Sequence, residues 1–289
     1  MLKDYLRVAK PWIVFANVLS AAGGFFLAAQ GRIDVGLFLA VLVGISAVVA
    51  SGCVCNNYID RDIDALMART ATRPLARQSI STVGSLLYAL ILGVIGLAIL
   101  GLGTNLLTLA IVVAGFAVYV GVYSLVMKRT SAYSTVVGSL AGAAPPLAAY
   151  CAVTGRLDLG GLIVLAIFSL WQIPHSYAIT IYRFKDYAAA SLPVMPVRHG
   201  VAATKKDMVV HIIAFTLAAQ LLTVCGYAGY AYSGVVAMLS LYWLTVAWTG
   251  PKLQTELLWA RKLYILSILT IVVVSVMMSV DYTATVPLP

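Results

Sequence analysis

Apolar runs of about 20 residues recur along the chain, each long enough to cross the hydrocarbon layer of a membrane as a helix. A helix satisfies its own backbone hydrogen bonds inside lipid, and the weaker alternating pattern of barrel strands is absent. The pattern therefore predicts an all-α polytopic membrane protein. The nine predicted spans are about 12–29, 36–56, 83–102, 105–126, 133–152, 160–181, 208–228, 233–249 and 262–280.

The composition supports this assignment. Of the 289 residues 62% are hydrophobic and 10% are charged, whereas a soluble domain carries about 25% charged residues. The predicted loops are too short for a separate soluble domain, so we expect a single transmembrane domain over residues 1–289. The first apolar run has no small-residue cleavage site and is interpreted as a span and not as a signal peptide.

The basic residues lie mainly on one side of the predicted membrane. With nine spans, all Lys and Arg residues except Arg32 and Arg156 fall on the side of the N-terminus. This asymmetry predicts a cytoplasmic N-terminus and a periplasmic C-terminus. The net charge of +9 is then explained by topology and the lipid bilayer, and it requires no nucleic-acid partner.

Two predicted cytoplasmic loops are long, at about 57–82 and 182–207. At the start of the first, Asn56, Asp60 and Asp64 are spaced four apart, which places them on one stripe of a helix, and Asp62 points away from it. Stacked carboxylates repel one another unless a cation lies between them, and oxygen ligands favour Mg²⁺. The alternative is a water-exposed helix end whose acids pair with nearby basic residues. We expect Asp64 to be water-exposed in either case.

Basic residues follow the first acidic stripe. Arg69, Arg73 and Arg77 are again four apart, and guanidinium groups suit phosphate oxygens. Lys128 and Arg129 end the fourth predicted span on the same side of the membrane. These residues either bind a diphosphate or only anchor the topology.

The second long loop begins with a similar combination. Tyr182 and Asp186 are four apart, and Arg183 lies between them. Asp186 offers a carboxylate to a second metal ion, or it pairs with Arg183 or Lys185 at the helix end. Further along the loop, a pair of prolines at positions 193 and 196 is expected to leave an irregular segment.

His175 is the only histidine in the interior of a predicted span, and it follows Pro174. Ionisable groups within membranes are usually functional. A histidine that bonds a neighbouring helix is the plainer interpretation.

The stretch from Asn56 to Asp64 is similar to the Asn-x-x-x-Asp-x-x-x-Asp motif of the membrane-embedded (UbiA-type) aromatic prenyltransferase superfamily. The stretches "FSLWQIPHSYAI" (168–179) and "YRFKDY" (182–187) resemble the haem branch of this superfamily. "KPWIVFANVLSAAGGF" (10–25), "YVGVYSLVMKR" (119–129), "GSLAGAAPP" (138–146) and "WARKLY" (259–264) extend the resemblance over nearly the whole chain.

The resemblance implies a nine-helix bundle around a central cavity. It also implies transfer of a farnesyl group from farnesyl diphosphate to a vinyl group of haem b, which gives haem O, in the inner membrane of a bacterium. A haem A synthase or a terminal oxidase is the product acceptor that it suggests.

The family uses Mg²⁺ held by two acidic motifs, which here implies ligands at Asn56, Asp60, Asp64 and Asp186. Tyr182 replaces the first Asp that many members carry in the second motif. The candidate catalytic residues are Asp60, Asp64, Lys128, Arg129 and Asp186. The candidate substrate-binding residues are Asn56, Tyr58, Arg73, Arg77, Trp171, His175, Tyr182 and Arg183.

Two other functions fit parts of the pattern. A prenyltransferase of this superfamily that acts on a hydroxybenzoate or a quinone-precursor ring is expected to have a different kinked-helix environment from "WQIPHSYA" (171–178). A cation transporter would use Asp60 and Asp64 as its ion site, although transporters usually bind near the bilayer midplane.

Overall fold

The computed structural model describes residues 2–250 and 255–283. Outside the helices, this part of the chain contains one isolated bridge, between Ala228 and Tyr282. Nine helical segments of the described chain are long and apolar enough to cross a membrane, which confirms the predicted number and the all-α class. They are α2 (Pro11–Ala29), α3 (Val35–Ile59), α5 (Thr82–Gly103), the segment Leu106–Thr130, α8 (Ser134–Thr154), α9 (Leu159–Tyr182), α11 (Met195–Val224), α12 (Tyr230–Thr249) and α13 (Glu256–Val280).

The fourth spanning segment is not a regular α-helix. It consists of α6 (Leu106–Phe116), the π-helix η1 (Ala117–Met127) and α7 (Lys128–Thr130). π-helical segments are rare and occur frequently at functional sites. A continuous apolar run has no feature that distinguishes a π-helix from an α-helix, so the sequence pattern does not predict it.

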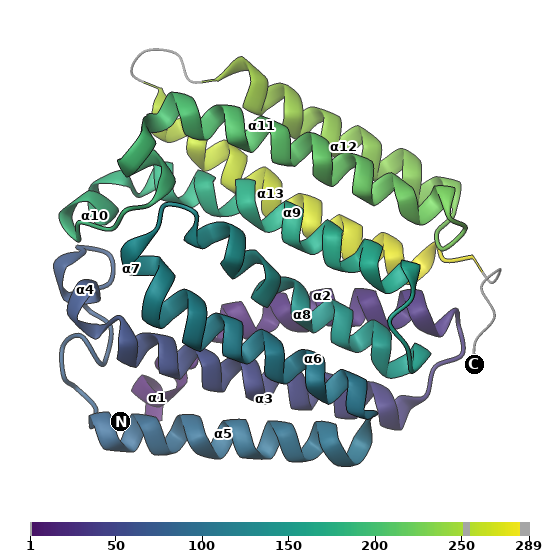
Figure 1. Ribbon diagram of the computed structural model, residues 1–289, viewed down its shortest axis with the longest axis horizontal. Coiled ribbons are helices and arrows are strands. Elements are labelled where there is room, and N and C mark those ends of the chain that lie inside the picture. The colour runs from purple at the N-terminus through teal and green to yellow at the C-terminus, as the bar shows by residue number, and fades with distance from the viewer. Residues whose placement is uncertain (1, 251–254, 284–289) are drawn as a thin grey trace.

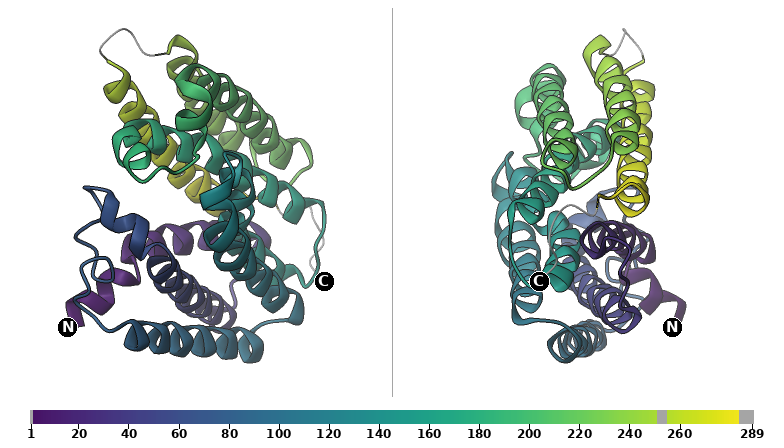
Figure 2. Two further views of the ribbon diagram at one scale, coloured as in Figure 1. Left: turned by 60° about the vertical axis from the view of Figure 1, so that its left-hand side comes forward. Right: turned by 90° about the vertical axis from the view of Figure 1, so that its right-hand side faces the viewer.

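The spanning helices form two groups that meet where α8 packs against α9 (Figure 1). In one group α3 packs against α5, and α2 packs against α8. In the other, α9 packs against α11 and α13, and α12 lies against both of these helices. Because α2 also contacts α13, the first and last spanning helices are neighbours, as two further views also show (Figure 2).

The short helices gather at one end of the bundle. These are α1 (Leu2–Val8), α4 (Arg61–Leu66), α7 and α10 (Phe184–Ala189), and they lie at the left of Figure 1. The predicted cytoplasmic loops with their acidic motifs therefore come together at the same end.

Four of the apolar helices begin at a polar residue whose side chain caps the first turn. The side chains of Asp34, Ser81, Asn105 and Asp158 each accept a hydrogen bond from a backbone N–H group in the first turn of the helix that follows. Such N-caps satisfy donors that have no partner within the helix. They explain why α3, α5, α6 and α9 begin where they do.

Small residues let the helices approach closely. A Cβ atom added to Gly24 on α2 would lie 2.2 Å from the backbone oxygen of Pro146 on α8. A Cβ atom added to Gly96 on α5 would lie 2.8 Å from the backbone oxygen of Gly44 on α3. Close backbone contact of this kind is the usual way in which membrane helices gain packing energy.

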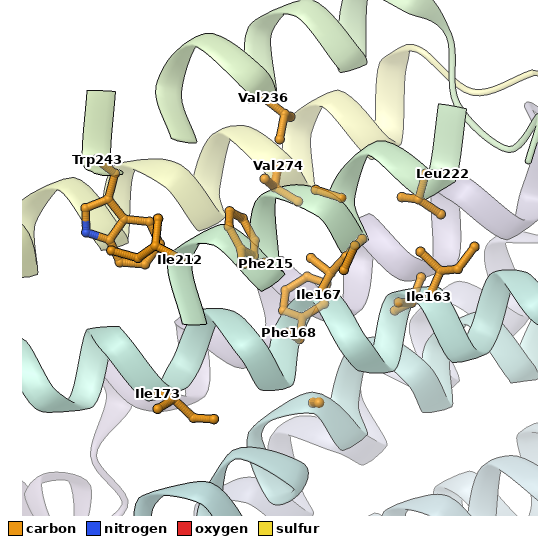
Figure 3. Close-up of a cluster of buried hydrophobic side chains, with 14 of the residues drawn as sticks. Ile163, Ile167, Phe168, Ile173, Ile212, Phe215, Leu222, Val236, Trp243 and Val274 are labelled. Atoms are coloured by element: carbon orange, nitrogen blue, oxygen red, sulfur yellow. The ribbon is translucent and has the colours of Figure 1, made fainter. Parts of the chain in front are cut away.

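The largest buried cluster belongs to the second group of helices. Figure 3 shows Ile167 and Phe168 of α9 beside Phe215 of α11, with Trp243 of α12 and Val274 of α13 also in the cluster. All five side chains are at most 2% exposed. This cluster fixes α9, which carries one wall of the cavity described below.

The prediction for the second long loop is wrong at its end. We expected a loop over 182–207 and a span over 208–228, but α11 begins at Met195. Pro196 occupies the first turn, where the missing N–H group costs nothing. The helical geometry is interrupted only at Gly200, where φ is 80°. Lys252 and the predicted periplasmic C-terminus lie outside the described residues.

Candidate functional site

The first acidic motif lies where α3 ends and α4 begins. Asp60 joins the two helices, and its Oδ2 accepts a hydrogen bond from Asn56 Nδ2 at 2.8 Å. Asp60 is fully buried and Asp64 is 1% exposed. The predicted water exposure of Asp64 is therefore wrong, because the turns that follow α4 cover it. Asp62 does point away, with 61% of its side chain exposed.

Each acid of this motif has its own basic partner. Lys128 Nζ donates to Asp60 Oδ2. Arg73 Nη1 donates to both carboxylate oxygens of Asp64, at 2.9 and 2.7 Å. The alternative of pairing with Arg61 or Arg69 is not observed for Asp60 or Asp64 in the described structure. Asp60 is neutralised by a residue 68 positions away in the sequence, and Asp64 by a residue nine positions away.

The exposed acid of the motif also has a partner, since Arg129 binds both oxygens of Asp62, at 2.6 and 2.7 Å. This hydrogen-bonded pairing lowers the pKa of Asp62 to about 2. Arg129 also donates to the backbone oxygen of Ile59 at 2.6 Å. Arg129 therefore ties the end of the fourth spanning segment to the turn between α3 and α4.

Lys10 belongs to this cluster, although the sequence analysis assigned it only a topological role. Its Nζ donates to Asn56 Oδ1 at 2.6 Å. Burial lowers the pKa of Lys10 to about 8. The residue adopts left-handed backbone angles, with φ 51° and ψ 67°, which costs a residue with a Cβ atom about 1–2 kcal/mol. A strained residue that delivers an ammonium group to a buried polar cluster indicates a functional position.

The second motif lies at the end of α9. The Arg183 guanidinium stacks over the Tyr182 ring, 4.5 Å from its centroid. Asp186, on α10, is half-buried. Its side chain forms no hydrogen bond or ion pair with the described residues, so the alternative pairing with Arg183 or Lys185 is not observed. Asp186 is therefore a carboxylate without a neutralising partner in this part of the chain.

A cavity of about 310 Å³ lies inside the bundle, and of the predicted metal ligands only Asn56 lines it. Asn56 and Lys128 lie on its wall at the polar end. Its other walls are largely apolar and come from α2, α3, α6, η1, α8 and α9. Gly138 and Gly142 of α8 line the cavity without a side chain that would fill it. The side chain of Gln172 on α9 occupies the space beside Gly142.

The aromatic lining of this cavity was missed by the sequence analysis. Phe116, Tyr119 and Tyr123 line it, and the two tyrosine rings stack with centroids 6.1 Å apart. Tyr187 of α10 lines it as well. The four-residue spacing of Tyr119 and Tyr123 just before Lys128 is the signal in the sequence that could have indicated them.

Several predicted substrate-binding residues lie elsewhere. The Tyr58 ring is covered by the Arg61 guanidinium, 4.3 Å from its centroid, and Arg77 pairs with Asp4 at 3.0 Å. The residues around Arg69, Arg73 and Arg77 form successive turns and not a helix, so the four-residue spacing does not make a stripe. Trp171 and His175 face α13 beside the cavity and do not line it.

The donor set fits a hard cation. Asp60 Oδ1 is buried and has no hydrogen-bond partner among the described residues. Together with the amide oxygen of Asn56 and the carboxylates of Asp64 and Asp186, it offers only oxygen, as Mg²⁺ prefers. Among the described residues, no three acidic, histidine or cysteine side chains are close enough to hold one ion by themselves. An ion here would need oxygen ligands from water or from a substrate.

Comparisons with known proteins agree over nearly the full length. A family model described as the UbiA prenyltransferase family matches residues 17–274. The protoheme IX farnesyltransferase of Serratia proteamaculans is 56% identical over 285 residues, which cover 99% of this chain and 96% of that protein. The protein of the same name from Yersinia enterocolitica is 56% identical over 282 residues, 98% of this chain and 95% of that protein.

Solved structures share the fold at low identity. A structure of a digeranylgeranylglyceryl phosphate synthase superposes with a TM-score of 0.77 at 17% identity, over 96% of this chain and 98% of that chain. A UbiA homolog from Archaeoglobus fulgidus bound to GPP and Mg²⁺ gives a TM-score of 0.73 at 17% identity, over 96% and 100% of the two chains. The extent of the family match, together with the identity to full-length relatives, shows that the chain belongs to the UbiA prenyltransferase family.

Proposed function

We propose that this protein transfers the farnesyl group of farnesyl diphosphate to a vinyl group of haem b and thereby forms haem O. The observation that carries the proposal is the 56% identity to protoheme IX farnesyltransferases over nearly the whole of both chains. An apolar cavity that ends at a cluster of buried charges suits a substrate with a long prenyl chain and a diphosphate head.

The diphosphate belongs at the polar end of the cavity. Lys128 lines this end, and Lys10 and Arg73 bind Asn56 and Asp64 of the same buried cluster. Arg129 binds the exposed Asp62 and lines a separate pocket, so it is not one of the groups at this end. The oxygen donors of Asn56, Asp60, Asp64 and Asp186 would hold Mg²⁺. Bound there, the ion would stabilise the negative charge that develops on the diphosphate as its bond to the farnesyl carbon breaks.

The apolar part of the cavity protects the allylic cation that remains. The faces of aromatic rings attract cations, and Phe116, Tyr119 and Tyr123 lie on the cavity wall. The remaining lining side chains are mostly aliphatic or glycine, which keeps water away from the reactive carbon. These residues orient the prenyl chain and shield it until the haem vinyl group attacks.

We propose the following placement in the cell. The protein is a single domain over residues 1–289 in the inner membrane of a bacterium, with its N-terminus in the cytoplasm and its C-terminus in the periplasm. The loops of the two acidic motifs then face the cytoplasm, where soluble farnesyl diphosphate and Mg²⁺ are available. Release of the product to a haem A synthase or a terminal oxidase remains a prediction.

The test is an assay with the purified protein in lipid nanodiscs. Haem b, farnesyl diphosphate and Mg²⁺ are incubated with it, and the extracted haem is analysed by mass spectrometry. We expect a haem whose mass has increased by one farnesyl group and one hydroxyl group, because the water that captures the second cation loses a proton. If haem b stays unchanged while a hydroxybenzoate acceptor is prenylated under the same conditions, the assignment of haem as the acceptor is wrong.

A further inference from the structure

His175 lies beside the cavity, about two turns from the end of α9 at Tyr182. Its ring stacks on that of Trp171, with centroids 4.7 Å apart and an angle of 24° between the planes. The ring of Tyr264, on α13, lies with its centroid 5.4 Å from that of the His175 ring. The next residue along α9, Ser176, lines the cavity. His175 itself faces α13, so a group bound to it would lie at the side of the cavity wall.

The hydrogen bonds around His175 determine which ring nitrogen carries the proton. His175 Nδ1 lies 2.7 Å from Ser267 Oγ, and the Ser267 hydroxyl donates to the backbone oxygen of Tyr264 at 2.6 Å. A hydroxyl group has only one hydrogen to donate. Nδ1–H must therefore be the donor to Ser267, which leaves Nε2 as an unprotonated nitrogen with a free lone pair. No described residue hydrogen-bonds Nε2.

The same serine fixes the neighbouring ring. Trp171 Nε1 donates to the backbone oxygen of Ser267 at 2.7 Å. The indole and the imidazole are thus both tied to one residue of α13, and neither ring can rotate without losing a hydrogen bond. A histidine whose Nδ1–H is held by a neighbour and whose Nε2 is free has the arrangement that metal-binding histidines show.

The first turns of α2 are poorly covered by the rest of the protein. Residues 11–16 of this helix are all exposed or half-buried, and Trp12 and Phe15 are 85% and 61% exposed. Further along, α2 meets α13 closely, because a Cβ atom at Gly23 would lie 3.0 Å from the backbone of Ser275. The two helices therefore touch in the halves that lie away from the acidic motifs, and a porphyrin that binds His175 would have to enter between their other halves.

The size of the cavity also places the acceptor outside it. A volume of about 310 Å³ is at the lower end of the range that encloses one drug-sized ligand, roughly 300–1,000 Å³. A farnesyl chain and a whole porphyrin do not both fit. Only the edge of the porphyrin that carries the reacting vinyl group needs to enter.

From these contacts we propose that Nε2 of His175 is an axial ligand of the haem iron in the acceptor complex, with the porphyrin beside Trp171 and Tyr264. The inference rests on the proposed function, because it names the position of the acceptor. A serine hydroxyl is a weaker acceptor for Nδ1–H than a carboxylate is, so the imidazole stays a moderate ligand. A moderate bond suits a haem that must leave after the reaction.

The test measures haem ligation without turnover. The full-length protein in nanodiscs is loaded with haem b in the absence of farnesyl diphosphate, reduced, and examined by resonance Raman and absorption spectroscopy. The native protein should show an iron–histidine stretching band. His175→Gly should lose this band and bind haem at least about tenfold more weakly, and added imidazole should restore the band. His199→Ala, a matched change of an exposed histidine, should leave the spectrum unaltered.

Ser267→Ala provides a second readout that does not remove the ligand. Without the hydroxyl acceptor, the imidazole becomes less basic, and the band should persist at a lower frequency. An unchanged band in His175→Gly, or an unshifted band in Ser267→Ala, would overturn the inference while the native protein still binds haem. Failure of the native protein to bind haem b at all would instead overturn the proposed function.

Discussion

Asp64→Asn is the sharpest test of the first acidic motif, because it removes one charge and keeps the shape of the side chain. Arg73 Nη1 contacts both carboxylate oxygens of Asp64, and the Asp64 side chain is 2% exposed. The substitution therefore has two effects that must be separated. It takes a ligand from the proposed Mg²⁺ site, and it leaves Arg73 without its partner.

The structure sets the size of the effect on stability. Removing one partner of a fully buried pair costs about 3–5 kcal/mol. Arg73 retains 26% side-chain exposure, so water can hydrate it, and the asparagine oxygen can still accept one hydrogen bond. We therefore expect a loss nearer to the 1–3 kcal/mol of an unsatisfied buried group.

The effect on turnover should be larger and independent of that loss. Removing one group that stabilises the transition state typically costs about 10²–10³-fold in rate, or about 2.7–4 kcal/mol. We expect at least about a 10²-fold decrease in haem O formation, measured by mass spectrometry at a protein level matched to the native enzyme. The melting temperature in the same nanodiscs reports stability separately.

The double variant Asp64→Asn/Arg73→Gln distinguishes the two roles of Asp64. Replacing both charges leaves no uncompensated buried charge, so most of the lost stability should return. Turnover should not return, because the carboxylate ligand and a diphosphate contact are both missing. Recovery of turnover together with stability would refute the reasoning, since Asp64 would then act only as the counter-ion of Arg73.

Three further predictions concern topology, metal and packing. A reporter that works only in the cytoplasm should be active when inserted at residues 67–79 and inactive at Gly155; the reverse would overturn the proposed orientation. A chelator of divalent ions should abolish haem O formation, and Mg²⁺ or Mn²⁺ should restore it, whereas full activity without divalent ions would exclude the metal. Gly24→Ala should lower stability by about 1–3 kcal/mol because its Cβ would meet the Pro146 backbone. Gly234→Ala, which has no atom within 4 Å, should be neutral or stabilising; equal melting temperatures for both variants would contradict the packing argument.

The helices could be predicted because their signal is local. A membrane span needs only a run of apolar residues, and all nine such runs of the described chain form helices. The contact between Asn56 and Asp60 followed in the same way from the four-residue spacing within one helix. The wrong start of α11 also has a local cause, because a proline in the first turn of a helix looks the same in the sequence as one that ends a helix.

The pairing of charges could not be predicted, because it depends on how distant segments pack. Lys128 and Asp60 are 68 residues apart, and Lys10 and Asn56 are 46 residues apart. Sequence spacing gives no information across such distances. The role of Lys10 in the site could not be recognised, because the positive-inside asymmetry explains every basic residue on that side of the membrane equally well.

These pairings suggest why the site carries so many charges of both signs. Asp60 and Asp64 are buried, and charges without partners in a low-dielectric interior cost several kcal/mol each. Lys128 and Arg73 neutralise them in the structure. Because Mg²⁺ and a diphosphate carry opposite charges, their joint binding lets the acids turn to the ion and the bases turn to the phosphate oxygens. The cluster then exchanges partners with little change in buried net charge, and we expect either ligand alone to bind more weakly than the two together.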